Sequence, residues 1–236
     1  MSASKSLQMK KSDIQSQPGN AQTALPLHSF TNYYLGTIFR PRRTFDALSA
    51  DHRRLRFGLL ALAINAVLYT LVYVFLTLAG GAPSSFTPWL AIPLDTYYYY
   101  NQFFLAPSMF MGGILAAAVA QLASRVFAGK GSFEDTLSMF GFATSIACLA
   151  SLAHDLPDSF LGAIGILNQR EYEVALNSPT IWRVILLTLY TLSIIWFIIL
   201  FPKAIGAAQR IRRGPAVFVG VLAYVVYQGV FVIFNR

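Results

Sequence analysis

The stretch from Phe57 to Leu78 reads FGLLALAINAVLYTLVYVFLTL and decides the fold. It contains no charged residue, and its one amide side chain is Asn65. A helix needs about 20 predominantly apolar residues to cross the hydrocarbon core of a bilayer, and this run has that length. Because no water reaches the core, the backbone must satisfy its own hydrogen bonds there. The stretch therefore predicts a transmembrane helix.

Four further apolar runs follow along the chain. Apolar residues make up 56% of the sequence and charged residues 12%, whereas a soluble domain is roughly 25% charged. The third run is the shortest and is only marginally long enough to span. We predict an all-α, polytopic membrane protein with five transmembrane helices, at residues 57–78, 102–127, 136–153, 181–201 and 215–234.

Local signals mark two of the run ends. Ser132 and Asp135 form an S-x-x-D pattern just before the third run, which predicts a capping box. Pro202 follows the fourth run and is expected to end or bend that helix, because proline lacks the backbone N–H.

The residues before the first run divide into two parts. Residues 1–26 are polar, predict a disordered tail and contain no apolar segment of the signal-peptide kind. Residues 27–56 mix aromatic rings with arginines, which is typical of short amphipathic helices on a membrane surface. A partly ordered loop is the alternative. The candidate partner or lipid contacts are Arg40, Arg42, Arg43, Phe45, Arg53 and Arg54.

Basic residues are distributed unevenly between the predicted loops. The chain has 18 lysines and arginines, 10 aspartates and glutamates, and a formal net charge of +8. Only Arg170, Arg183 and Arg236 lie on one side of the predicted membrane; the other bases lie on the opposite side. The positive-inside rule places the N-terminus in the cytoplasm and the C-terminus outside. We therefore expect contact with anionic headgroups at the cytoplasmic face, and no nucleic-acid partner.

Small and polar residues inside the runs suggest helix packing. A four-residue spacing of small side chains lets helices approach closely, and the second run has such a stripe at Gly112, Ala116, Ala120 and Ser124. The candidate intramembrane polar residues are Asn65, Gln121 and Gln228. No ionisable residue lies near the middle of a run, which disfavours proton-coupled transport. A facilitator or channel for a small solute stays open as an alternative.

One polar cluster, His154-Asp155-Leu156-Pro157-Asp158, follows the third run. An imidazole with two carboxylates can bind a metal or act as acid and base. Pro157 predicts irregular backbone, so we interpret the cluster as a loop at a helix end, and we expect neither metal nor cofactor nor catalytic residues. The apolar stretch Phe160 to Leu167 is too short to span, which favours an interfacial or re-entrant segment.

Three further features have ordinary explanations. The run Tyr97 to Tyr100 predicts an aromatic belt at the membrane interface, with a ligand cage as the alternative. The sequence GKGS at residues 129–132 lacks the contiguous Gly-Lys-Ser/Thr of a phosphate-binding loop. The lone Cys148 excludes a disulfide framework within the chain.

The order of several short motifs resembles the Yip family (Ypt-interacting-protein domain), in its bacterial form. RPRRTFDAL at residues 40–48 is similar to the family's P-x-x-T-F-x-x-L motif before the first span. GKGSFEDTL at residues 129–137 is similar to its G-x-G-S/T-F turn into a helix. DLP at residues 155–157 resembles the end of its third span, and Trp182 with FPKA at residues 201–204 fits the fourth. The resemblance covers about residues 30 to 236.

The resemblance implies a five-helix membrane domain with a cytoplasmic N-terminus, here in a bacterial inner membrane. Eukaryotic members bind small GTPases, but their D-L-Y-G-P motif is absent from this chain, so that activity is not carried over. We therefore expect a non-enzymatic protein that binds lipids, other membrane proteins or itself. A transporter or channel is the first alternative, and an enzyme using His154, Asp155 and Asp158 is the second.

Overall fold

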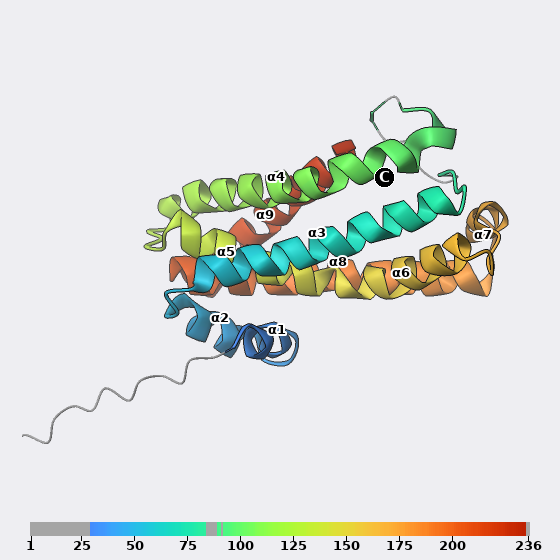
Figure 1. Cartoon of the computed structure of the whole chain (residues 1–236). Helices are drawn as coiled ribbons and strands as arrows, with labels where there is room; N and C mark the ends of the chain where they lie inside the picture. The colour runs from blue at the N-terminus through green and yellow to red at the C-terminus, as the bar shows by residue number, and fades with distance from the viewer. Residues whose placement is uncertain (1–28, 84–88, 91, 235–236) are drawn as a thin grey trace, which may run out of the picture.

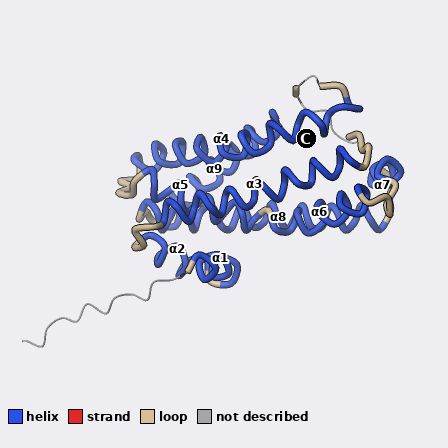
Figure 2. Tube along the Cα trace, in the orientation of Figure 1, coloured by secondary structure: helices blue, strands red, loops and turns tan. Residues whose placement is uncertain are grey.

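The computed structural model describes residues 29–83, 89–90 and 92–234. Within these residues every regular element is a helix, and Figure 2 shows no strand. The elements are α1 (Phe30–Phe39), α2 (Pro41–Ser49), α3 (Arg54–Leu78), the 3-10 turn η1 (Leu94–Thr96), α4 (Tyr97–Val126), α5 (Phe133–Ala147), α6 (Leu149–Ala163), α7 (Gln169–Leu176), α8 (Ile181–Gln209) and α9 (Arg213–Phe234).

The long helices run side by side as one bundle, with the short helices at its two ends (Figure 1). The helix α4 packs along α9, α3 packs along α4 and α5, and α8 packs along α5 and α9. The helices α1 and α2 lie against the side of the bundle near the end where α3 begins, while α7 lies at the opposite end (Figure 1). The predicted tail at residues 1–26 lies outside the described residues.

Four helices are each long and apolar enough to cross a membrane, namely α3, α4 with η1, α8 and α9. The consecutive helices α5 and α6 pass the same test only as a pair and are bent by 51° at Cys148. Counting the pair as one span gives five crossings. The chain is therefore an all-α polytopic membrane protein, which confirms the predicted fold class.

The structure corrects two expectations based on prolines. Pro157 lies inside α6, so the cluster at residues 154–158 is helical and not a loop, and only residues 160–163 of the apolar stretch after it belong to the same helix. Pro202 was expected to end or bend its helix; it lies inside α8, which continues to Gln209, so it does not end the helix. In both helices one missing N–H is tolerated because the flanking turns keep their own bonds and packing.

The helix α4 begins earlier than the predicted second span. Tyr97 to Tyr100 form its first turn, and they divide between two environments. Tyr97 and Tyr98 are buried in the bundle, whereas Tyr99 and Tyr100 are about half exposed. The predicted aromatic belt is thus a helical turn of which only two rings face outward.

Two glycines allow a direct backbone contact between α3 and α5. A Cβ on Gly141 would lie 2.0 Å from the carbonyl oxygen of Gly58, and a Cβ on Gly58 would lie 2.4 Å from Ser138 Cα. The two backbones touch here because neither glycine carries a side chain. Ser132 and Asp135 form the predicted capping box, which fixes the start of α5.

Candidate functional site

Exposed lysines and arginines gather at the end of the bundle where α3 begins. We call this surface the basic face. It consists of Arg40, Arg42, Arg43, Arg56, Arg125, Lys130, Lys203, Arg210, Arg212 and Arg213, all of them exposed. These residues come from α2, α3, α4, α8, α9 and the connecting turns, and the loops meet where the Lys130 N–H donates to Gln209 O at 2.9 Å.

Two of the predicted arginine contacts are engaged within the chain. The Arg53 guanidinium donates to Asp51 Oδ2 at 3.1 Å and stacks over the Phe57 ring at 4.8 Å. Arg54 forms an ion pair with Asp135 at the start of α5. Arg54 therefore ties α3 to α5. Within the basic face Arg125 also donates to the Gly129 carbonyl at 3.1 Å, and the other exposed bases are the ones available to a ligand.

Asp51 is the acceptor that holds this juxtamembrane region together. It also accepts from the Tyr33 hydroxyl at 3.1 Å, which anchors α1. Burial alone would raise the pKa of Asp51, but the hydrogen bonds from Arg53 and Tyr33 outweigh it and hold that pKa below its usual value. Burial and the Asp51 carboxylate raise the pKa of Tyr33 to about 12, so Tyr33 remains a donor at neutral pH.

Phe45 is not available as a lipid or partner contact, which corrects the expectation for that residue. Its side chain is fully buried, as is Leu48 one turn later. The apolar side of α2 packs on α8 and α5, so it faces protein and not bilayer. Arg42 and Arg43 lie on the exposed side of the same helix. The amphipathic pattern does form a helix, but the apolar side of that helix packs on α8 and α5 and not on the bilayer.

Gln121 belongs to a polar network behind the basic face. Gln209 donates to the Gln121 side-chain oxygen and to Thr136 Oγ1, the latter at 2.6 Å. The Gln121 amide donates to the Gly131 carbonyl at 3.0 Å. The network joins α4, α5 and α8 and stabilises the packing there.

The predicted small-residue stripe lies on the buried side of α4, which packs on α9. A Cβ on Gly112 would lie 3.2 Å from the Tyr227 ring. Ala116, Ala120 and Ser124 are fully buried. The stripe therefore faces a helix of the same chain.

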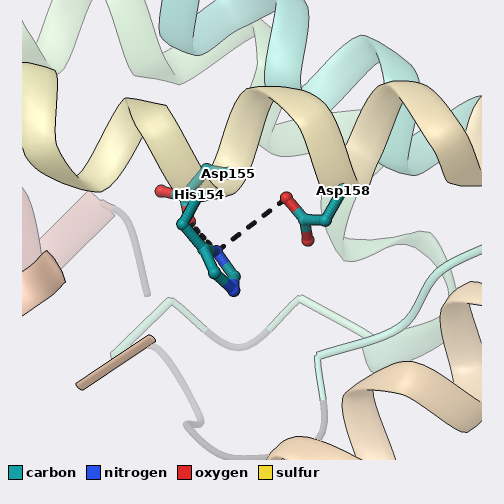
Figure 3. Close-up of side chains that lie close together, drawn as sticks. All are labelled: His154, Asp155 and Asp158. Carbon is teal, nitrogen blue, oxygen red and sulfur yellow. Dashed lines mark hydrogen bonds and ion pairs between the residues drawn. The ribbon is translucent and has the colours of Figure 1, made fainter. Parts of the chain in front are cut away.

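The opposite end of the bundle holds a cavity of about 510 Å³ between α3, α6, α7, α8 and α9. His154, Asp155 and Asp158 line it from α6, and Figure 3 shows the three side chains converging. His154 Nδ1 lies 2.9 Å from Asp155 Oδ1 and 3.9 Å from Asp158 Oδ1. Residues at positions i and i+4 share one side of a helix, and α6 achieves this because it continues through Pro157.

Later elements supply the partners of this cluster. The Tyr172 hydroxyl of α7 lies 3.0 Å from His154 Nε2, and Tyr190 of α8 donates to Asp155 Oδ2 at 2.8 Å. Gln169, at the start of α7, lines the same cavity. The sequence did not indicate Tyr172, Gln169 or Tyr190 as part of this cluster, because their positions depend on how α7 and α8 fold back against α6. The only hint in the sequence is that each of the two helices after α6 carries a tyrosine, Tyr172 and Tyr190.

The other predicted polar residues are dispersed. Asn65 is buried in α3, where its side chain meets Cys148. Gln228 of α9 lines the cavity and donates to Tyr224 at 3.4 Å, while Gln121 belongs to the network at the far end. The structure therefore does not bring Asn65, Gln121 and Gln228 together along one cavity.

The fold and these sites define a helical integral membrane protein with one strongly basic end. The family model described as the Yip1 domain matches residues 35–234. The chain therefore belongs to the Yip1 domain family, as its motifs indicated. No curated protein and no solved structure matches it.

Proposed function

We propose that this protein acts without catalysis, as a membrane-organising protein that binds anionic lipid headgroups through its basic face. The proposal places the protein in the bacterial inner membrane, with the basic face and the N-terminus in the cytoplasm. The observation that carries it is the exposure of the ten lysines and arginines of the basic face at one end of a membrane bundle. Each Lys or Arg near an anionic surface contributes about 1 kcal/mol of attraction.

The positions of the arginines on α2 support this choice of ligand. The buried side of α2 fixes the helix to α8, so Arg42 and Arg43 are held outward at the level of the bundle end. Arg40, which begins the same segment, is also exposed. Arginine matches phosphate geometry with a planar fork of donors. Three arginines on one anchored segment suit the phosphates of neighbouring lipids.

Binding of other membrane proteins, or of a second copy, is the second candidate. The observation that favours it is the helix α8, of which only 22% of the apolar window is buried inside the chain. Its exposed apolar residues include Trp182, Leu187 and Ile198. In a bilayer these residues face either lipid or another helix.

A solute pathway has weaker support. The cavity at the far end is lined by Gln228, but Gln121 lies at the basic end and Asn65 is outside the cavity lining. Asn65, Gln121 and Gln228 thus do not line one path between the two ends, and the transporter alternative rests on the cavity alone.

Removing Arg40 and the two arginines of α2 tests lipid binding. We expect the triple variant Arg40→Ala, Arg42→Ala, Arg43→Ala to lose enrichment of anionic lipid, by about 100-fold in affinity if the three contributions add. The measurement is fluorescence energy transfer from purified protein in nanodiscs to labelled phosphatidylglycerol, with labelled phosphatidylcholine as the reference. Raised salt should weaken the wild-type signal, because exposed charges are screened.

The matched control is the pair Arg170→Ala, Arg183→Ala, which removes bases from the opposite end. It should keep the wild-type lipid signal. Equal enrichment of phosphatidylglycerol by wild type and by the α2 variant would contradict the proposal. If the lipid signal falls only in preparations where another protein copurifies and covers α8, binding of membrane proteins gains support instead.

A further inference from the structure

The cluster on α6 has the spacing of a metal site. Its three ligand atoms, one from each of His154, Asp155 and Asp158, lie within 4.8 Å of one another. Zinc bonds to histidine nitrogen and carboxylate oxygen are about 2.0–2.2 Å, so two ligands of a tetrahedral ion stand about 3.3 Å apart. The observed separations from His154 Nδ1, 2.9 Å and 3.9 Å, lie on either side of that value. Small side-chain adjustments would equalise them.

The surroundings of the cluster match those of metal-bound histidines. The second ring nitrogen of a ligating histidine normally bonds an outer partner that fixes the tautomer. Here Tyr172 occupies that place, 3.0 Å from His154 Nε2, which leaves Nδ1 toward the two carboxylates. Tyr190 donates to Asp155 and so orients the first carboxylate.

Two buried oxygens in this region lack a hydrogen-bond partner among the described residues, Asp158 Oδ1 and Gln169 Oε1. Gln169 is 3% exposed and lines the same cavity. Its oxygen lies against α6 at Gly162, one turn beyond Asp158, where a Cβ would stand 2.6 Å from it. An unpaired buried oxygen is costly unless a donor or cation meets it. The Gln169 amide donates to the Asp158 carboxylate, and the second oxygen of that carboxylate, Oδ1, is left as an acceptor that a cation can meet.

The charges around the cavity also favour a cation. Asp155, Asp158 and Glu173 line it, and among its described lining residues there is no lysine or arginine. Two carboxylates outnumber one imidazole here, and a nearby cation favours the charged form of both carboxylates. A divalent ion would balance the negative charges of Asp155 and Asp158.

We propose that His154, Asp155 and Asp158 bind a divalent transition-metal ion of the zinc class at the end of the bundle opposite the basic face. His154 coordinates through Nδ1, the two aspartates each give one oxygen, and the fourth position belongs to a water. Imidazole with carboxylates suits zinc, cobalt and manganese rather than calcium. The site is independent of lipid binding, which uses the other end.

The test is metal binding by purified, chelator-treated protein that carries no polyhistidine tag. Zinc is titrated by calorimetry, and Co²⁺ is used as a spectroscopic probe of four-coordinate nitrogen and oxygen ligation. We expect one saturable ion per chain. Asp158→Asn, which keeps the side-chain shape, and His154→Ala should each weaken binding by at least about 100-fold, and Tyr172→Phe by roughly 10-fold as an outer partner.

His52→Ala is the matched control, because His52 also lies beside an aspartate but is 80% exposed at the basic end. It should bind zinc as the wild type does. No saturable zinc or cobalt binding by wild type, or unchanged affinity in both His154→Ala and Asp158→Asn, overturns the proposal. If these two variants fail to fold, two other results decide. One ion per wild-type chain with weaker binding by Tyr172→Phe supports the site, and no saturable binding with no change in Tyr172→Phe overturns it.

Discussion

Replacing Gly141 by leucine should remove most of the folded protein. A Cβ at this position would lie 2.0 Å from the carbonyl oxygen of Gly58 and 2.7 Å from its carbonyl carbon. These are backbone atoms of a packed helix and cannot rotate away. Overpacking costs about 1–3 kcal/mol where side chains can yield, so we expect about 3 kcal/mol or more here. Against a total stability of about 5–15 kcal/mol that is a large loss.

Size-exclusion chromatography and thermal unfolding in mild detergent measure the effect. Gly229→Leu is the matched control, since Gly229 lies within α9 and nothing stands within 4 Å of its added Cβ. It should elute and melt as the wild type does. A Gly141→Leu variant as stable as Gly229→Leu would show that α3 and α5 do not cross at these glycines.

Replacing Phe201 by alanine should lower stability by a different mechanism, the loss of packing. The Phe201 ring is fully buried and stacks on Phe140 with centroids 4.4 Å apart and planes at 15°. In water such a truncation costs about 3–5 kcal/mol. In lipid the unfolded helix keeps its ring in an apolar solvent, so only the contact and cavity terms remain. We expect about 2–3 kcal/mol, most of it from the cavity left beside Phe140.

Thermal unfolding again provides the measurement, now with Phe218→Ala as the control. Phe218 is 62% exposed on α9, so its truncation leaves no cavity in the bundle. The melting temperature should fall clearly for Phe201→Ala and little for Phe218→Ala. Equal shifts for the two variants would contradict the buried position assigned to Phe201.

Apolar length was enough to predict the fold class, because a bilayer permits few structures other than helices in a single chain of this composition. The run at residues 57–78 lies within α3, which begins three residues earlier at Arg54. The capping box at Ser132 and Asp135 was readable because it depends on neighbours three residues apart.

Prolines and glycines limited the prediction of helix ends and of contacts between helices. Pro157 was expected to make the backbone irregular, and Pro202 to end or bend its helix, whereas both lie inside helices that continue past them. The contact of Gly58 with Gly141 joins residues far apart in the sequence, and a single sequence does not reveal that pairing. The bend at Cys148 also has no local signal, since no proline or glycine pair stands there.

The sequence identified several residues of the candidate sites, but it did not show how these residues come together in the folded chain. The arginines of α2 were found because exposed bases beside aromatic residues form a local pattern. The burial of Phe45 was missed, since it depends on α8. His154, Asp155 and Asp158 were recognised as a cluster, but their geometry was misjudged because it requires α6 to remain helical. Only the folded chain reveals the partners Tyr172 and Tyr190.

Site-directed cysteine labelling tests the central claim, that the chain crosses the membrane five times with its basic face in the cytoplasm. The native Cys148 is buried, so introduced cysteines report alone. In intact cells a membrane-impermeant maleimide should label Ser178→Cys, in the turn between α7 and α8, but neither Lys130→Cys nor Arg212→Cys until the cytoplasmic side is opened. Labelling of Ser178→Cys from the same side as Lys130→Cys would show that α5 and α6 re-enter instead of spanning, and would contradict the five-span account.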